Sequence, residues 1–255
     1  MEKSKTIVLI HGMFVNNKSW SEWKNYFESK GYKVHAPANP GHKGNPAELR
    51  KNIHPQLTQT GFEDVVMNIV KLIDTLPEKP IVIGHSMAGL VVQKLIEMDK
   101  AVAGISIDGA PPKNVMAPLS TVKIVWPAVN IFKKSAYMGS LDWYRRAFFN
   151  TLPENEIQKA FDEIAVPESR KIGQDTLLKS FSNVDFKKPH QPLLFIAGEK
   201  DAIFPPDLTQ KIANKYSDKN SIVDYKMFEG KSHFLCGEKG WEEISEYILN
   251  WIEKR

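Results

Sequence analysis

The chain of 255 residues is long enough for one large domain with a sizeable buried core. Its composition, 42% hydrophobic and 25% charged, excludes a disordered or fibrous protein. The net charge of +4, without a long block of one sign, gives little reason to expect binding to nucleic acid or to an anionic membrane.

The cysteine content and the N-terminal sequence bear on the location of the protein. Cys236 is the only cysteine, which excludes an intrachain disulfide and a zinc site built from several thiolates, and suits a reducing compartment. The apolar run at residues 6–10 is too short for a signal peptide or a membrane span. We therefore expect a cytoplasmic protein with no membrane span, either a monomer or a homodimer.

Short apolar runs alternate with amphipathic helical patterns along most of the chain. Several runs are nearly continuous in Val, Ile and Leu, which is typical of strands buried on both faces. The alternation predicts a parallel sheet with helices on both faces. The expected strands are residues 6–10, 32–36, 80–84, 103–107, 192–198 and 221–228, and the expected helices are residues 19–30, 62–76, 90–98, 205–216 and 241–252.

The first expected helix has signals at both ends. Ser19 and Glu22 have the spacing of a capping box, and Gly31 has the position of a helix stop. Trp20, Trp23 and Phe27 would share one face of this helix.

Residues 113–187 interrupt the alternation, because they contain many aromatic residues but no clear strand. Within them, the stretch after Pro153 has apolar residues at helical spacing. We interpret residues 113–187 as a helical cap inserted into a core formed by residues 1–112 and 188–255. Long insertions in α/β domains are usually binding elements, so we expect the cap to cover a site at the carboxyl ends of the strands. The alternative is a helical subdomain that only adds stability.

The sequence "PIVIGHSMAG" places Ser86 between a short apolar run and a helical pattern. Gly84 and Ala88 flank it in a G-x-S-x-A arrangement, a variant of the G-x-S-x-G pattern in which a strand turns sharply into a helix and exposes a nucleophilic serine. Small residues are needed on both sides of such a turn. The alternative is that Ser86 only caps the helix.

A serine nucleophile needs a base to take its proton and an acid to orient that base. Asp201 follows the expected strand 192–198, and His233 follows the expected strand 221–228. The chain order of serine, aspartate and histidine is that of α/β-hydrolases. Asp108, at the end of the strand 103–107, is an alternative acid. Four other histidines have no evident partner in the sequence: His35, His42, His54 and His190. His85 precedes Ser86 directly, but we expect its side chain to point away from the serine.

Acyl transfer also requires two N–H donors for the negatively charged carbonyl oxygen of the transition state. We expect one from Met87, the residue after the serine, and the other from Met13, in the loop that Gly12 allows to turn closely. Phe14 is the reserve candidate for the second donor. We expect His11 to support this loop by hydrogen bonding.

Four motifs, "HGMF", "GHSMAG", "GEKDAIFPP" and "KSHF", occur in the order found in the α/β-hydrolase superfamily. The sequence resembles in particular its cap-bearing serine esterases and lipase-like members. The family's usual first two strands have no counterpart in this sequence, so the resemblance implies a six-stranded, wholly parallel sheet. A serine at position 86 differs from the aspartate nucleophile of dehalogenase and epoxide hydrolase relatives.

The combined expectation is a serine hydrolase that cleaves carboxylic esters of small or medium apolar substrates through an acyl-serine intermediate. Ser86, His233 and Asp201 would be catalytic, and we expect neither a cofactor nor a metal. Perhydrolase, lactonase and hydroxynitrile lyase activities use similar triads in this fold, and a ligand receptor with slow turnover is a further alternative.

Overall fold

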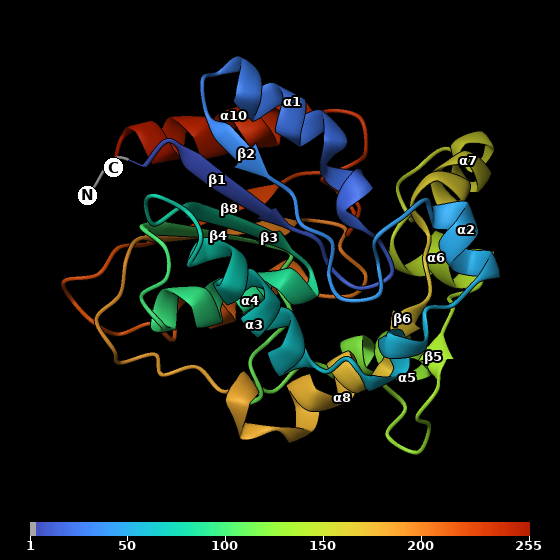
Figure 1. The fold of residues 1–255 in the computed structure, drawn as a ribbon. Helices are drawn as coiled ribbons and strands as arrows, with labels where there is room; N and C mark the ends of the chain where they lie inside the picture. Colours follow the sequence, from blue (N-terminus) through green and yellow to red (C-terminus); the bar gives the residue numbers. More distant parts are fainter. Residues whose placement is uncertain (1–3) are drawn as a thin grey trace.

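The centre of the molecule is a six-stranded, wholly parallel sheet, as predicted (Figure 1). The structure is a computed structural model that describes residues 4–255. The strand order is β2-β1-β3-β4-β7-β8. The strands are β1 (Thr6–Ile10), β2 (Lys33–His35), β3 (Ile81–His85), β4 (Ala103–Ile107), β7 (Leu193–Gly198) and β8 (Val223–Phe228).

Strands β1, β3, β4 and β7 are buried at every position, which explains their nearly continuous apolar sequences. Successive side chains of a strand point to opposite faces of the sheet, so β1 contributes Ile7 and Leu9 to one apolar cluster and Val8 and Ile10 to the other. The edge strands β2 and β8 are partly exposed.

Helices cover both faces of this sheet (Figure 1). On one face lie α1 (Ser21–Ser29) and α10 (Trp241–Glu253). On the other lie α3 (Phe62–Ile73), α4 (Met87–Glu97) and α9 (Pro206–Ala213). Each presents an apolar stripe to the strands, so the periodicity in the sequence located these helices correctly to within a few residues.

The segment 113–187 forms most of the remaining structure, at the carboxyl end of the sheet (Figure 1). Its aromatic residues Trp143, Tyr144 and Phe148 belong to the same apolar cluster as the strands. The segment also contains two short strands that the sequence did not indicate and that pair with each other in antiparallel fashion. Its elements are α5 (Leu119–Val129), β5 (Ala136–Tyr137), α6 (Leu141–Ala147), α7 (Glu154–Ile164), β6 (Glu168–Ser169), α8 (Arg170–Leu178) and the 3-10 helix η3 (Ser180–Ser182).

The connection from β2 to α3 contains two helices that the sequence patterns did not predict, α2 (Pro46–Lys51) and the 3-10 helix η2 (Pro55–Gln59). Both are short, and each buries only one residue, so neither leaves a strong apolar stripe in the sequence. None of the helices within residues 4–255 combines the length and apolar character needed to cross a membrane.

The predicted capping box of Ser19 and Glu22 is wrong. Ser19 lies inside a 3-10 helix, η1 (Asn17–Trp20), which Asn16 caps by accepting a hydrogen bond from the Lys18 N–H at 3.1 Å. Because α1 begins only at Ser21, Ser19 is too early to cap it. The expected stop is confirmed, since α1 ends at Ser29 and Gly31 adopts a φ of 85°.

Candidate active site

Ser86 occupies a sharp turn between β3 and α4, with φ 60° and ψ −125°, a conformation that is strained for any residue other than glycine. A Cβ added at Gly84 would lie 2.3 Å from the Ala88 carbonyl oxygen, and one added at Gly89 would lie 2.5 Å from the Gly109 Cα. Glycine is therefore required at positions 84 and 89, whereas the fully buried Ala88 fits in its place. The structure thus has the backbone geometry that the G-x-S-x-A sequence indicated.

Ser86, His233 and Asp201 lie in one hydrogen-bonded line. The Ser86 Oγ is 2.9 Å from His233 Nε2, and His233 Nδ1 is 2.8 Å from the Asp201 Oδ2. The other Asp201 oxygen accepts hydrogen bonds from the backbone N–H groups of Ile203 and Phe204, at 2.7 and 2.9 Å. In this arrangement Nδ1–H donates to the carboxylate, and Nε2 is left to accept the serine proton.

His233 is held by its surroundings as well as by Asp201. The Nε2–H of His85 donates to the His233 carbonyl oxygen at 2.7 Å. Burial and the neighbouring His233 lower the pKa of His85 to about 3, so this ring is a neutral donor at physiological pH. The rings of Phe148 and Phe204 contact the His233 ring edge-on, with centroids 5.0 and 5.6 Å away. As expected, His85 points away from Ser86, but its support of His233 was not anticipated.

Asp108 is fully buried beside the line but does not take part in it. One of its oxygens accepts the Gly198 N–H at 2.8 Å, and the other has no partner among the described residues. Burial and the charge of Asp201 raise the pKa of Asp108 well above its ordinary value and so favour the protonated form of this carboxyl. Asp201, and not Asp108, is the acid that binds His233.

The ligand atoms of Asp108, His85 and His233 lie within 4.8 Å of one another, a composition that could suit a metal ion. Both ring nitrogens of His233 are, however, hydrogen-bonded to Ser86 and Asp201. We therefore assign no metal to this cluster.

The residues of the two expected oxyanion donors, Met13 and Met87, line the same cavity as Ser86. Met87 is the first residue of α4, where the helix dipole favours negative charge. A Cβ added at Gly12 would lie 2.8 Å from the Ser86 Cβ, so glycine allows the loop that carries Met13 to approach the serine. Within residues 4–255, neither the Met13 nor the Met87 N–H has a hydrogen-bond acceptor. The Phe14 N–H is directed at Glu168 Oε2, 3.4 Å away, so the reserve candidate is not free to bind substrate.

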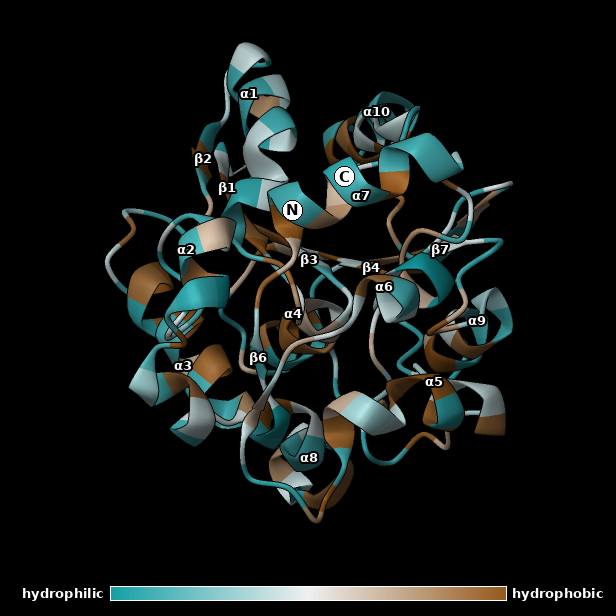
Figure 2. Ribbon diagram, turned by 90° about the vertical axis from the view of Figure 1, so that its right-hand side faces the viewer, coloured by the Kyte–Doolittle hydropathy of each residue, from teal (hydrophilic) through white to brown (hydrophobic). Residues whose placement is uncertain are grey.

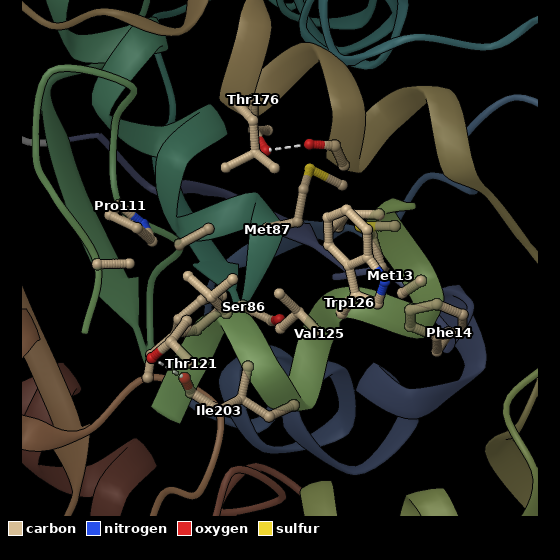
Figure 3. Close-up of a pocket in the computed structure, with 18 of the residues that line it drawn as sticks. Met13, Phe14, Ser86, Met87, Pro111, Thr121, Val125, Trp126, Thr176 and Ile203 are labelled. Atoms are coloured by element: carbon tan, nitrogen blue, oxygen red, sulfur yellow. Dashed lines mark hydrogen bonds between the residues drawn. The ribbon is translucent and has the colours of Figure 1, made fainter. Parts of the chain in front are cut away.

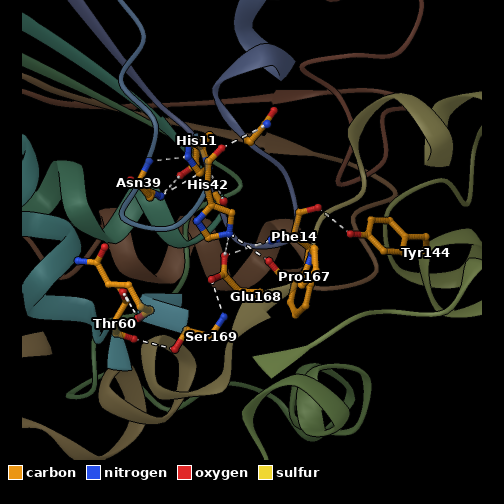
Figure 4. Close-up of polar contacts among 12 residues, drawn as sticks. His11, Phe14, Asn39, His42, Thr60, Tyr144, Pro167, Glu168 and Ser169 are labelled. Carbon is orange, nitrogen blue, oxygen red and sulfur yellow. Dashed lines mark hydrogen bonds and ion pairs between the residues drawn. The ribbon is translucent and has the colours of Figure 1, made fainter. Parts of the chain in front are cut away.

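A buried polar network fixes the loop that carries Met13 (Figure 4). Phe14 has a φ of 68°, and its carbonyl oxygen accepts hydrogen bonds from the Tyr144 hydroxyl at 2.6 Å and the Val166 N–H at 3.1 Å. Both of these donors belong to the segment 113–187. His11 accepts the Asn39 N–H at 3.0 Å on Nε2, which confirms its predicted role in supporting the loop.

The same network contains a buried contact between a histidine and a carboxyl group that the sequence did not reveal. His42 Nε2 lies 3.3 Å from Glu168 Oε2, and both side chains are fully inaccessible to solvent. Burial raises the pKa of Glu168, while His42 and the Ser169 and Phe14 N–H groups favour its ionised form. The expectation that His42 has no partner is therefore wrong, because its partner comes from β6.

A cavity of about 130 Å³ opens above Ser86, close in volume to engineered cavities that bind benzene (Figure 3). Its lining contains no charged side chain. The hydroxyls of Thr121 and Thr176 do not have a free proton for a ligand, since they donate to the Ile203 and Gly173 carbonyl oxygens at 2.6 and 2.7 Å. The segment 113–187 and the rest of the chain both line the cavity. The lining residues are Met13, Phe14, Ser86, Met87, Ala110, Pro111, Ile203 and Phe204 from outside this segment, and Ala117, Thr121, Val122, Val125, Trp126, Ala128, Val129, Trp143, Phe148, Gly173, Thr176 and Leu177 from within it.

Comparison with known proteins identifies the family of the chain. The model of the alpha/beta hydrolase family matches residues 7–246, and the chain belongs to this family. No curated protein matches the chain by sequence.

Three similar solved structures have low sequence identity and therefore bear on the fold alone. A methylesterase, MES16, from Arabidopsis has a TM-score of 0.72 and 14% identity, covering 98% of this chain and 99% of that one. A monoacylglycerol lipase from Paleococcus ferrophilus has a TM-score of 0.68 and 18% identity, with coverages of 97% and 93%. A pyrethroid hydrolase from Sphingobium faniae has a TM-score of 0.69 and 17% identity, and both coverages are 97%.

Replacement of Glu168 by alanine should lower the free energy of unfolding by about 3 kcal/mol, because it removes one partner of a buried pair and an acceptor for two backbone N–H groups. Urea unfolding measures this loss. Glu163→Ala is the control, since this side chain on α7 is 60% exposed and should change stability by less than about 0.5 kcal/mol. Equal stability of the two variants would contradict the assigned role of the pair.

Asp108→Asn should become more stable relative to the wild type as the pH rises. The raised pKa means that Asp108 keeps a proton in the folded protein that it releases in the unfolded chain. The contribution of Asp108 to the free energy of unfolding of the wild type therefore falls as the pH rises above about 4, by at most about 1.4 kcal/mol per pH unit. Asparagine resembles the protonated acid and lacks this dependence. Measuring the free energy of unfolding of both proteins at pH 5 and pH 8 tests this prediction, and Asp142→Asn is the exposed control. A relative stability of Asp108→Asn that stays constant between these pH values would show that Asp108 is ionised in the folded protein.

Proposed function

We propose that the protein is a serine hydrolase that cleaves carboxylic esters through an acyl-serine intermediate. The observation that carries the proposal is the line from Ser86 Oγ through the His233 ring to Asp201, with contacts of 2.9 and 2.8 Å. Membership of the alpha/beta hydrolase family supports hydrolysis in general.

In the first step, Ser86 Oγ would attack the ester carbonyl carbon while His233 Nε2 takes its proton. The N–H groups of Met87 and Met13 would bind the oxyanion, and Asp201 would stabilise the positively charged ring. Collapse of the intermediate breaks the bond to the alcohol, which leaves with the proton from His233. Water, activated by the same histidine, would then attack the acyl-serine and release the carboxylic acid.

The cavity supports an uncharged, apolar substrate of small or medium size. A charged acyl or alcohol group would lose its hydration there without meeting an opposite charge. The similar structures include proteins described as a methylesterase, a monoacylglycerol lipase and a pyrethroid hydrolase, which agrees with ester chemistry but leaves the substrate open.

A panel of p-nitrophenyl esters of graded chain length, run beside lactone, cyanohydrin and peroxide assays, separates the proposed esterase from a lactonase, hydroxynitrile lyase or perhydrolase. The esterase should show a burst of p-nitrophenol followed by fast steady turnover. A single stoichiometric burst would identify a ligand receptor instead.

Ser86→Ala should reduce kcat for the best ester at least about a thousandfold, because it removes the oxygen that would form the acyl intermediate. Circular dichroism and thermal unfolding should show that the variant keeps the wild-type fold. Retention of most of the activity by a folded variant would disprove the mechanism.

Asp201→Asn should reduce kcat/KM about a thousandfold or more, because the amide cannot hold the His233 tautomer or balance its charge. Asp108→Asn, the matched control, should stay within about tenfold of the wild type, because Asp201 and not Asp108 is bonded to His233, and asparagine keeps an oxygen that can accept the Gly198 N–H. If the Asp108 variant proved the more impaired of the two, the assignment of the catalytic acid would be reversed.

A further inference from the structure

Apolar side chains are exposed together on the outer surface of residues 113–187. Phe132 and Met116 are each 82% exposed, and Leu119 is 68% exposed. Soluble monomers rarely expose large contiguous apolar patches unless these bind something. We define the cap apolar patch as Met116, Leu119, Val122, Trp126, Ile131, Phe132, Leu177 and Leu178.

Helix α5 is the centre of this patch, and it is apolar on both sides. Its inner side carries the buried Thr121 and Ala128, while Leu119, Val122 and Trp126 lie at helical spacing on the outer side. Figure 2 shows the apolar residues of α5 and α8 in brown on neighbouring helices. A helix of this kind is normally covered on both sides.

The patch is held in place by hydrogen bonds. The Gln174 side-chain amide donates to the Asn130 and Lys133 carbonyl oxygens, both at 2.7 Å, and so ties the loop that carries Phe132 to α8. Lys113 Nζ donates to the Leu178 carbonyl oxygen at 2.8 Å at the other end of α8. The exposed apolar side chains thus lie on segments that are connected by hydrogen bonds.

The patch is continuous with the cavity above Ser86, because Val122, Trp126 and Leu177 are exposed and also line the cavity. An apolar molecule on the patch would therefore lie at the entrance to the candidate active site.

The stretch of chain that carries most of the patch is basic. Residues 113–141 contain four lysines and no aspartate or glutamate. Lys123, Lys133 and Lys134 are exposed among the apolar side chains. A second copy of the chain would bring lysine against lysine, without an acidic group in this stretch to pair with them. An anionic lipid surface complements both the lysines and the apolar side chains.

We propose that the cap apolar patch docks the protein on the surface of an anionic lipid bilayer. Trp126 and Phe132 enter the boundary between headgroups and acyl chains, and the three lysines contact lipid phosphates. The entrance of the cavity then faces the lipid, so an apolar ester dissolved in the bilayer reaches Ser86 without crossing water. The mild net charge of the whole chain gave no sign of this local arrangement.

Vesicle sedimentation tests the proposal independently of the proposed chemistry, because Ser86→Ala serves as the background and prevents hydrolysis. Vesicles of phosphatidylcholine alone are compared with vesicles that also contain phosphatidylglycerol, at low and high salt. The protein should bind the anionic vesicles, and salt should weaken the binding.

Two patch variants are measured against matched controls. Lys133→Gln with Lys134→Gln should weaken binding about 25-fold, at about fivefold for each lysine. Phe132→Ser should weaken it about tenfold. The controls are Lys215→Gln with Lys219→Gln, and Ile222→Ser just before β8. These residues are exposed but do not belong to the patch or its lysines, so the control variants should bind as tightly as the background protein.

Three results would overturn the proposal: no binding to either kind of vesicle, equal binding by the patch and control variants, or a stable dimer in light scattering that Phe132→Ser dissociates. The last would make the patch an interface between copies of the chain. In the Ser86 wild-type background, the patch variants should hydrolyse a short, water-soluble p-nitrophenyl ester at the wild-type rate. This control separates a docking defect from a failure of the active site.

Discussion

The arrangement of the site depends on one strained turn. Ser86 has a positive φ that costs about 1–3 kcal/mol and persists only where its surroundings impose it. Here the neighbouring strand does so, because the Ser86 N–H donates to the Ile107 carbonyl oxygen at 2.9 Å and the Ser86 carbonyl oxygen accepts the Ala110 N–H at 3.0 Å. The sheet thus supplies the free energy that keeps the serine Oγ exposed to His233 and to the cavity.

The segment 113–187 does more than line the cavity. Tyr144 and Val166 bind the Phe14 carbonyl oxygen, and Glu168 accepts the Phe14 N–H and lies against His42. These contacts hold the loop next to Met13, the proposed oxyanion donor. A change in the position of this segment would therefore alter both the shape of the cavity and the orientation of the proposed donor.

The sequence was sufficient for the sheet because its inner strands are buried on both faces, and this produces local apolar runs. Ser86, Asp201 and His233 could be singled out because each follows such a run, and strand ends of a parallel sheet meet at one edge. The contact between His42 and Glu168 could not be found in this way. It joins a loop residue to a residue of β6 far away in the chain, and neither residue has a local pattern that indicates the other. The cap at Asn16 could not be found from spacing either. Asn16 caps η1 through its side chain, and Ser19, the predicted cap, lies inside that helix.

The central claim is that Ser86 is a nucleophile activated by His233. An active-site-directed fluorophosphonate, followed by peptide mass spectrometry, tests it most directly. The account predicts one phosphonylated residue, Ser86, and much slower labelling when His233 is replaced by alanine. Labelling confined to another residue, or labelling of Ser86 at the same rate without His233, would contradict it.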